Sequence, residues 1–229
     1  MSWYGKPSGG YALSDPEGTA NAYEMHYMLD SDGYTLEAQA GIIGNVMAES
    51  ALNVWRWQND SYNPNNGGYG LFQYTPSTNG GTDKYIGTCS GLSYYAPNLS
   101  TSQVTAGAQV TDAICQMNVF MTDYLQKWNP YIWRSYWPTD ATLRAKVNTI
   151  LNTWGNGTTL TMSQFKNIND IESATLAFLG AFEGPLVPNL SPRVTNARAA
   201  YAVISGAPPT PSGNIPIWLM FKMKERWKH

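Results

Sequence analysis

The chain has 229 residues, of which 43% are hydrophobic and 13% charged, and its formal net charge is −2. This length and apolar content predict one compact domain with appendages, while the lack of a basic patch argues against nucleic acid as a partner. The many Tyr, Trp, Asn, Gly, Ser and Thr residues suit contact with neutral polymers such as glycans as well as ordinary packing.

The chain begins with an N-terminal extension, residues 1–16, in which no basic start precedes an apolar run. No secretory signal is therefore predicted. The apolar periodicity of residues 17–30 predicts a first helix, which the turn residues of "DSDG" end. A second helix follows, for which Thr35 is a suitable N-cap, and Glu37 lies in its first turn, where the helix dipole favours an acid.

The apolar stripe of this second helix ends in a carboxylate, Glu49. Glu49 lies in the last turn, where the helix dipole disfavours an anion, and partial burial beside Trp55 or Trp57 would add a desolvation penalty. Both effects favour the protonated carboxylic acid, which the general acid of a glycosidase requires. The alternative is a structural role, in which Glu49 caps the helix end or pairs with Arg56.

Residues 54–76 change character, because the Asn, Gly and Pro cluster at 63–68 breaks any helix and "YGLFQY" has β-like aromatic and apolar content. A short hairpin or small sheet is therefore predicted. Residues 79–102 are rich in Gly, Ser, Thr and Tyr without a sustained period, which predicts a long loop that forms part of a cleft wall.

The rest of the domain is predicted to be helical. Apolar residues at spacings of three and four predict a long amphipathic helix over 103–128. Further helices, each closed by a glycine, are predicted over 141–155, 170–184 and 192–206. The predicted fold is therefore mainly α, of the α+β class, with a minor β element.

A Pro/Gly/Ser linker at residues 206–214 ends the domain, which is predicted to span 17–205. The remaining residues, 215–229, form an amphipathic C-terminal tail. Its apolar run "IPIWLMF" is only seven residues long, so no transmembrane segment is predicted, although the run could lie at an interface or dock on a partner.

The two cysteines, Cys89 and Cys115, fit no zinc spacing, and with two His in the chain no soft-metal cluster can be assembled. Cys115 falls in a helical apolar pattern and Cys89 in a Gly/Ser loop, so whether they pair stays open. No residue cluster implies a metal or a cofactor, because acid catalysis on a glycosidic bond needs only carboxyl groups and shape.

Four blocks of sequence carry a family resemblance over about residues 20 to 204. They are "NAYEMHYMLDSDGYTLEAQAGIIGNVMAES", "WQND", "GYGLFQYTP" and "ATLAFLGAFEGPLVPNLSPRVTNARAAY". In this order they resemble lysozyme-like peptidoglycan hydrolases and lytic transglycosylases, and among these the phage tail lysozyme family, the wall-degrading domain of tail-tip morphogenesis proteins. The resemblance implies a lysozyme-like fold, with a helical core and a small β-hairpin or sheet lining a glycan cleft.

Carried onto this sequence residue by residue, the resemblance places the catalytic acid at Glu49, and at Ser50 an accompanying residue that orders the helix end. Gln73 is similar to the family's substrate-contacting Gln on the cleft strand, and Gly68 and Gly70 would let the glycan approach the backbone. Candidates for sugar stacking, each equally suited to the core, are Trp57, Tyr69, Phe72 and Tyr74.

The second carboxylate is less defined, with Asp60, Asp83 and Glu183 available. Glu183 occupies the position where lytic transglycosylases carry an Asn. It is a candidate general base or glycan contact, with a structural pair to Arg193 or Arg198 as the alternative. Asp60 lies where egg-white-type lysozymes carry their second acid. A lytic transglycosylase needs only the single Glu, since the substrate's own hydroxyl attacks.

The resemblance implies a glycosidase of the muramidase type, which cleaves the β-1,4 bond between N-acetylmuramic acid and N-acetylglucosamine by general acid catalysis. It implies a place in the virion at the phage tail tip, with bacterial peptidoglycan as partner and other tail proteins as candidates for binding the C-terminal tail. The alternatives are a lytic transglycosylase, a chitin hydrolase, and a non-catalytic tail protein that keeps the fold.

Overall fold

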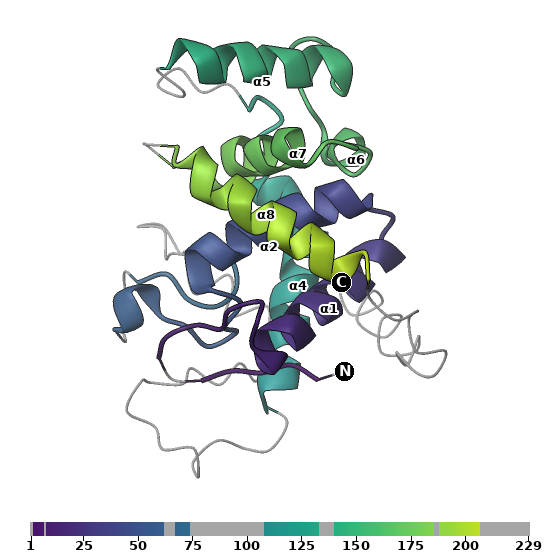
Figure 1. The fold of residues 1–229 in the computed structure, drawn as a ribbon. Helices are drawn as coiled ribbons and strands as arrows, with labels where there is room; N and C mark the ends of the chain where they lie inside the picture. Colours follow the sequence, from purple (N-terminus) through teal and green to yellow (C-terminus); the bar gives the residue numbers. More distant parts are fainter. Residues whose placement is uncertain are drawn as a thin grey trace, which may run out of the picture.

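The structure is a computed structural model that describes residues 2–6, 8–61, 67–73, 108–132, 140–185 and 188–206. Figure 1 shows that the described part is mainly helical, with α8 lying across α2 and with α5 at the far end beyond α7. The helices, in chain order, are α1 (Pro16–Ser31), α2 (Leu36–Ser50), the 3₁₀-helix η1 (Gln58–Asp60), α4 (Ala108–Lys127), α5 (Ala141–Thr153), α6 (Met162–Phe165), α7 (Ile171–Phe178), the π-helix η3 (Leu179–Glu183) and α8 (Leu190–Ile204).

The mainly α prediction is confirmed, and the helices predicted from periodicity are present with shifted ends. The predicted helix 170–184 changes type within its length, because the α-helix ends at Phe178 and the chain continues as a π-helix. It ends at Gly184, whose φ of 58° a glycine adopts without strain. The one-turn helix α6, closed at its start by a capping box from Thr161 and Gln164, was not predicted from the sequence.

The corner between α1 and α2 follows the local sequence. Asp32 is the C-cap of α1, and Gly33 takes a φ of 82°. Thr35 then caps α2 by accepting a hydrogen bond from the Ala38 N–H at 3.2 Å, as predicted. The Thr35 hydroxyl also donates to the Ile168 carbonyl, so the cap ties the start of α2 to the chain before α7.

Helix α2 packs most extensively against α8 and α7. Two glycines make this approach close. A Cβ on Gly44 would lie 2.6 Å from the Ala197 nitrogen of α8, and one on Gly41 would lie 2.8 Å from the Ala174 carbonyl carbon of α7. Any larger side chain would push the backbones apart, so these glycines set how closely both helices approach α2.

A buried cluster of phenylalanine rings joins the later helices to the segment 67–73. Phe178 and Phe182 stack with ring centroids 4.8 Å apart, and Phe120 of α4 meets Phe182 edge-on at 5.4 Å. Phe72 stacks on Phe120 at 4.8 Å. The Phe72 side chain therefore anchors the segment 67–73 in the core.

The predicted hairpin or small sheet over 54–76 is not confirmed. Within the described residues of this region, the pairing is an isolated antiparallel bridge between Trp57 and Tyr69. Gln73 lies in a turn rather than on a strand. The reason is local, because Gly70 and Gln73 have φ values of 76° and 46°, which extended backbone does not permit.

The segment that precedes α1 packs on the helices, and residues 2–6 and 8–15 are here named the N-terminal strap. Trp3 is only 1% exposed and belongs to the hydrophobic core. The Asn21 side chain of α1 accepts from the Tyr4 N–H at 2.8 Å and donates to the Tyr4 carbonyl at 2.9 Å. The domain start at residue 17 remains a sequence prediction, but the strap contributes directly to the core.

Other predictions fall partly or wholly outside the described residues. These include the loop 79–102, Asp83, the linker beyond Gly206 and the tail 215–229. Cys115 on α4 is described and is disulfide-bonded. Cys89, the other cysteine of the chain, lies outside the described residues. In the ranges that are described, no helix combines the length and apolar character needed to cross a bilayer.

Candidate functional site

A cavity of about 300 Å³ lies beside the C-terminal end of α2. Its lining comes from the last turn of α2, from the loop that follows and from the segment 67–73. The lining residues are Ala48, Glu49, Arg56, Gln58, Asn59, Gly68 and Gln73. The fold thus brings the predicted acid and the predicted substrate-contacting Gln to one cavity, whose volume is at the low end for ligand sites.

Glu49 is partly buried, with 24% of its side chain exposed. Its Oε1 atom accepts a hydrogen bond from Arg193 Nη2 of α8 at 2.5 Å, and the Arg193 side chain is 12% exposed. The predicted alternative pairing with Arg56 is wrong. Since Oε1 is occupied by a guanidinium, a proton carried by Glu49 for transfer would have to sit on Oε2.

Arg193 is itself held in place by a buried amide. Its Nη1 atom donates to the Asn45 carbonyl at 3.3 Å and to Asn45 Oδ1 at 3.1 Å. The Asn45 Nδ2 atom donates to the carbonyls of Gly41 and Thr175 at 2.8 and 3.1 Å, which fixes the direction of the amide. A continuous polar path therefore runs from α7 through Asn45 and Arg193 to the Glu49 carboxylate.

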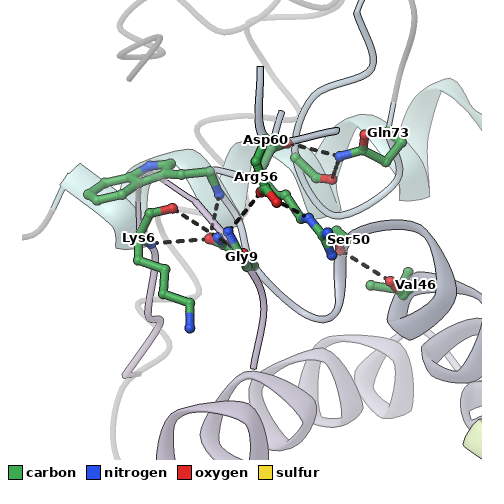
Figure 2. A network of polar contacts seen from close by, with 10 residues as sticks. Lys6, Gly9, Val46, Ser50, Arg56, Asp60 and Gln73 are labelled. Carbon is green, nitrogen blue, oxygen red and sulfur yellow. Dashed lines mark hydrogen bonds and ion pairs between the residues drawn. The ribbon is translucent and has the colours of Figure 1, made fainter. Parts of the chain in front are cut away.

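Ser50 is fully buried and lies away from the cavity. Its hydroxyl donates to the Val46 carbonyl one turn earlier at 3.1 Å, as Figure 2 shows. This is the local bond that a Ser hydroxyl makes to the carbonyl four residues earlier in the same helix. The geometry fits a role in ordering the helix end rather than contact with a ligand.

Gln73 and Gly68 are the lining residues that come from the segment 67–73. The Gln73 Nε2 atom donates to the carbonyls of Arg56 and Gly70, both at 2.9 Å. A Cβ on Gly68 would lie 2.9 Å from Gln73 Oε1, and one on Gly70 would lie 2.3 Å from Gln116 Oε1 of α4. The glycines are therefore needed for contacts within the protein, and only Gly68 of the two borders the cavity.

The predicted sugar-stacking residues lie in the core where they are described. Trp57 and Tyr69 are 0% exposed and Phe72 is 1% exposed, so none offers a ring face to a ligand. Trp57 and Tyr69 pack on each other with centroids 4.6 Å apart. The burial of these three rings fits the alternative prediction, a role in core packing. Tyr74 lies outside the described residues.

Glu183 ends the π-helix η3 and does not belong to the cavity lining. Its Oε1 atom is shielded from solvent. Of the two arginines weighed as structural partners of Glu183, Arg193 pairs with Glu49 and Arg198 lies 3.9 Å from Glu172 Oε2. No described contact joins Glu183 to Glu49.

Asp60 lies next to the lining residue Asn59 but is occupied by other contacts. Its Oδ1 atom accepts from the Gly9 N–H of the N-terminal strap at 2.7 Å and from Arg56 Nε at 3.3 Å. Figure 2 shows Arg56 and Asp60 directed toward each other beside Gly9. Each charged residue that lines the cavity therefore has a counter-ion, Arg193 for Glu49 and Asp60 for Arg56.

Sequence reasoning missed the partner of the acid and the residue that orients this partner. Asn45 had a detectable signal, because it is an amide within an apolar run one helical turn before Glu49. Arg193 had no sequence signal that pointed to Glu49, because the contact joins two helices, α8 and α2, that are far apart in the chain. Among the described residues, no group of three or more His, Cys, Asp and Glu side chains is placed to hold a metal ion.

Comparison with known proteins places these residues in a family. A profile of the family described as phage tail lysozyme matches residues 20–204. Morphogenesis protein 1 of Bacillus phage B103 is 26% identical over 196 residues, which is 85% of this chain and 42% of the relative. The chain thus spans less than half of that relative's length, and the matched range contains all the cavity-lining residues. The chain belongs to the phage tail lysozyme family.

Proposed function

We propose that the chain is a peptidoglycan-degrading glycosidase of a phage tail, with Glu49 as its general acid. The observation that carries this proposal is the placement of Glu49 at the cavity, with Oε1 held by Arg193 and Oε2 without a donor among the described residues. A general acid needs an oriented carboxyl group with an oxygen left for the substrate, and the Arg193 contact supports the proposal because it engages Oε1 and leaves Oε2 uncommitted.

In the proposed reaction, Glu49 transfers a proton from Oε2 to the oxygen of the β-1,4 bond between N-acetylmuramic acid and N-acetylglucosamine. The bond between this oxygen and the muramic acid anomeric carbon breaks, and the departing sugar keeps the proton as its hydroxyl. The positive charge that develops on the anomeric carbon is then quenched by a nucleophile. When the nucleophile is water, the product has a reducing end, and the proton from water restores Glu49.

A second candidate is lytic transglycosylation, in which the muramic acid's own 6-hydroxyl replaces water and an anhydro sugar forms. It is favoured by the cavity lining, because Glu49 is the one carboxylate among the lining residues of the described chain. Glu183 and Asp60 remain proposals for a hydrolytic base. For Asp60 to act in this way, Oδ2 would have to serve, since Oδ1 already accepts from Gly9 and Arg56.

The biological setting is also a proposal. The relative from phage B103 is named a morphogenesis protein, and the family is described as tail lysozymes. We therefore place the chain in the virion at the tail tip, where direct delivery to the wall removes the need for a basic surface that searches for anionic polymer. Residues 215–229 would contact other tail proteins. A non-catalytic tail role is the competing outcome.

The test is mass spectrometry of the soluble fragments released from purified peptidoglycan by the wild type, Glu49→Gln and Glu37→Gln. Glu37 lies in the first turn of the same helix, far along α2 from the cavity, so its variant is the matched control. We expect Glu49→Gln to lose about 10²- to 10⁴-fold in release rate while keeping wall binding and thermal stability, and Glu37→Gln to keep wild-type release.

The products separate the candidates. Reducing-end fragments establish hydrolysis, and anhydro fragments establish transglycosylation. Release from soluble chitin oligomers at the same rate would indicate a chitin hydrolase. The general-acid proposal is wrong if folded Glu49→Gln keeps wild-type turnover, and the enzyme proposal is wrong if the wild type binds the wall and releases nothing.

A further inference from the structure

The loop after α2 contains several residues in the left-handed region that are not glycine. Ala51, Leu52, Asn59 and Asp60 have φ values of 48°, 58°, 56° and 52°. This conformation costs free energy for a residue with a Cβ and persists only when surrounding contacts impose it. The loop 51–60 therefore depends on interactions with other parts of the chain.

The N-terminal strap contacts this loop at the strained residues. The Tyr11 N–H donates to the Ala51 carbonyl at 2.7 Å, and the Gly9 N–H donates to Asp60 Oδ1 at 2.7 Å. Gly10, between these two donors, lies so close that a Cβ would come within 2.1 Å of the Ala51 Cβ. The strap thus touches both ends of the loop.

A buried amide joins the strap to the middle of the loop. Asn53 is 0% exposed, and its Nδ2 atom donates to the carbonyls of Lys6 and Gly9 at 2.9 and 2.7 Å. Its Oδ1 atom accepts from the Lys6 N–H at 3.2 Å and from the Trp55 N–H at 3.0 Å. Figure 2 shows Gly9 of the strap between Lys6 and the pair formed by Arg56 and Asp60.

The same loop supplies one wall of the cavity. Arg56, Gln58 and Asn59 line it, and all three lie between the strap contacts at Asn53 and Asp60. The Arg56 carbonyl also accepts from Gln73 Nε2 at 2.9 Å, so the loop is tied to the segment 67–73, which lines the cavity as well. Helix α4 supports the loop from its other side, where Asp112 accepts from Trp55 Nε1 at 2.7 Å.

We propose that the N-terminal strap is a positioning element of the glycan cleft, which holds the strained loop 51–60 so that Arg56, Gln58 and Asn59 border the cavity together with Glu49. This inference rests on the proposed glycosidase function for its effect on turnover, but the clamp itself can be tested without activity. The strap lies before residue 20, outside the range that the family profile matches.

The test variant is Gly10→Val in the full chain, which places a branched side chain against Ala51 and lifts the strap there. Ser8→Val is the matched control. Ser8 is exposed, and the substitution introduces the same valine side chain two residues away from Gly10. Hydrogen exchange is measured first. We expect the Gly9 and Tyr11 amides and the loop 51–60 to exchange about tenfold faster or more in Gly10→Val, with α7 and α8 unchanged.

Turnover on peptidoglycan is measured on the same proteins. We expect kcat/KM to fall about 10- to 100-fold in Gly10→Val, mostly through kcat, because displaced wall residues misplace the bound glycan. Ser8→Val keeps the wild-type value. A second pair tests the Asp60 contact. Asp60→Asn keeps an acceptor oxygen for the Gly9 N–H, so we expect slower exchange of the Gly9 amide than in Asp60→Leu, which removes the acceptor.

The outcomes are distinct. Wild-type exchange in the loop of Gly10→Val overturns the clamp, and so does faster exchange that spreads equally to α7 and α8, since the strap would then be a general stabiliser. Faster loop exchange with unchanged kcat/KM overturns the link to the cleft. If the wild type releases no glycan fragments, the proposed function fails, and the exchange measurement still decides whether the strap holds the loop.

Discussion

The two walls of the cavity are held by different kinds of interaction. On the helical side, Glu49 projects from a regular α-helix that packs against α7 and α8 through glycine contacts. On the loop side, Arg56, Gln58 and Asn59 lie on backbone that includes several positive φ values and is fixed by hydrogen bonds from the N-terminal strap.

This difference shows that one wall of a site can be fixed by close packing while the other keeps its geometry only through hydrogen bonds to a neighbouring segment. Close packing of helical backbones has few alternative arrangements, so the position of Glu49 is set by the shape of the core. A strained loop keeps its geometry only while its partners remain bound, so its position responds to single hydrogen bonds. Packing changes should therefore disturb the helical wall, and contact changes should disturb the loop wall.

The largest stability effect is expected from Gly44→Ala on the helical side. Helix propensity alone would raise the free energy of unfolding by about 1 kcal/mol. The new Cβ, however, would lie 2.6 Å from the Ala197 nitrogen, so α2 and α8 must separate. We expect a net loss of about 1–3 kcal/mol, measured by urea unfolding.

The matched control is Gly206→Ala, because a Cβ at Gly206 would meet its nearest atom at an ordinary 3.7 Å. We expect a change in unfolding free energy within about 0.5 kcal/mol there. A gain of stability in Gly44→Ala would show that the two helices can separate without cost, and the packing account of the helical wall would be wrong.

The next effect concerns the orientation of the acid. Arg193→Gln replaces the guanidinium by a shorter, uncharged side chain. This removes the contact that holds Glu49 Oε1 and weakens the contact with Asn45. We expect kcat on peptidoglycan to fall about tenfold, because the carboxyl group samples unproductive directions. The measurement is initial-rate kinetics with wall binding recorded in parallel.

Arg198→Gln on the same helix is the control, since Arg198 is 68% exposed and lies 3.9 Å from its partner Glu172. Its kinetics should match the wild type. Arg193→Lys keeps the charge but loses the planar fork that reaches Asn45 and Glu49 together, so we expect it to restore only part of kcat. Full activity in Arg193→Gln would exclude a positioning role for Arg193.

The smallest effect is confined to alkaline pH and belongs to the strap. Burial, followed by the negative charge of Glu17 and by Tyr4, raises the pKa of Tyr11 from 10.0 to about 12. Between these values the unfolded chain has lost the phenol proton that the folded chain keeps, so stability falls as the pH rises through this window. We expect Tyr11→Phe to reduce this fall, measured as melting temperature between pH 9 and 12, relative to Tyr201→Phe on α8. Equal slopes in all three proteins would mean that Tyr11 does not titrate differently in the folded state.

The sequence by itself determined the local features of this protein. Periodicity and caps predicted the helices, because helix formation depends on neighbours within a few residues, as Thr35 at the start of α2 illustrates. The order of four sequence blocks indicated the family, and Glu49 was identified at a helix end. These conclusions needed only residues that are close together in the chain or ordered along it.

Only the tertiary structure decided which side chains meet. Arg193 was weighed as a partner for Glu183 and instead binds Glu49, because α8 lies against α2 through Gly44. Trp57 has the composition of a sugar platform, but it packs on Tyr69 in the core, where aromatic burial is favourable. Contacts between elements depend on how backbones approach in space, and the spacing of residues along the chain does not encode that approach in any simple pattern.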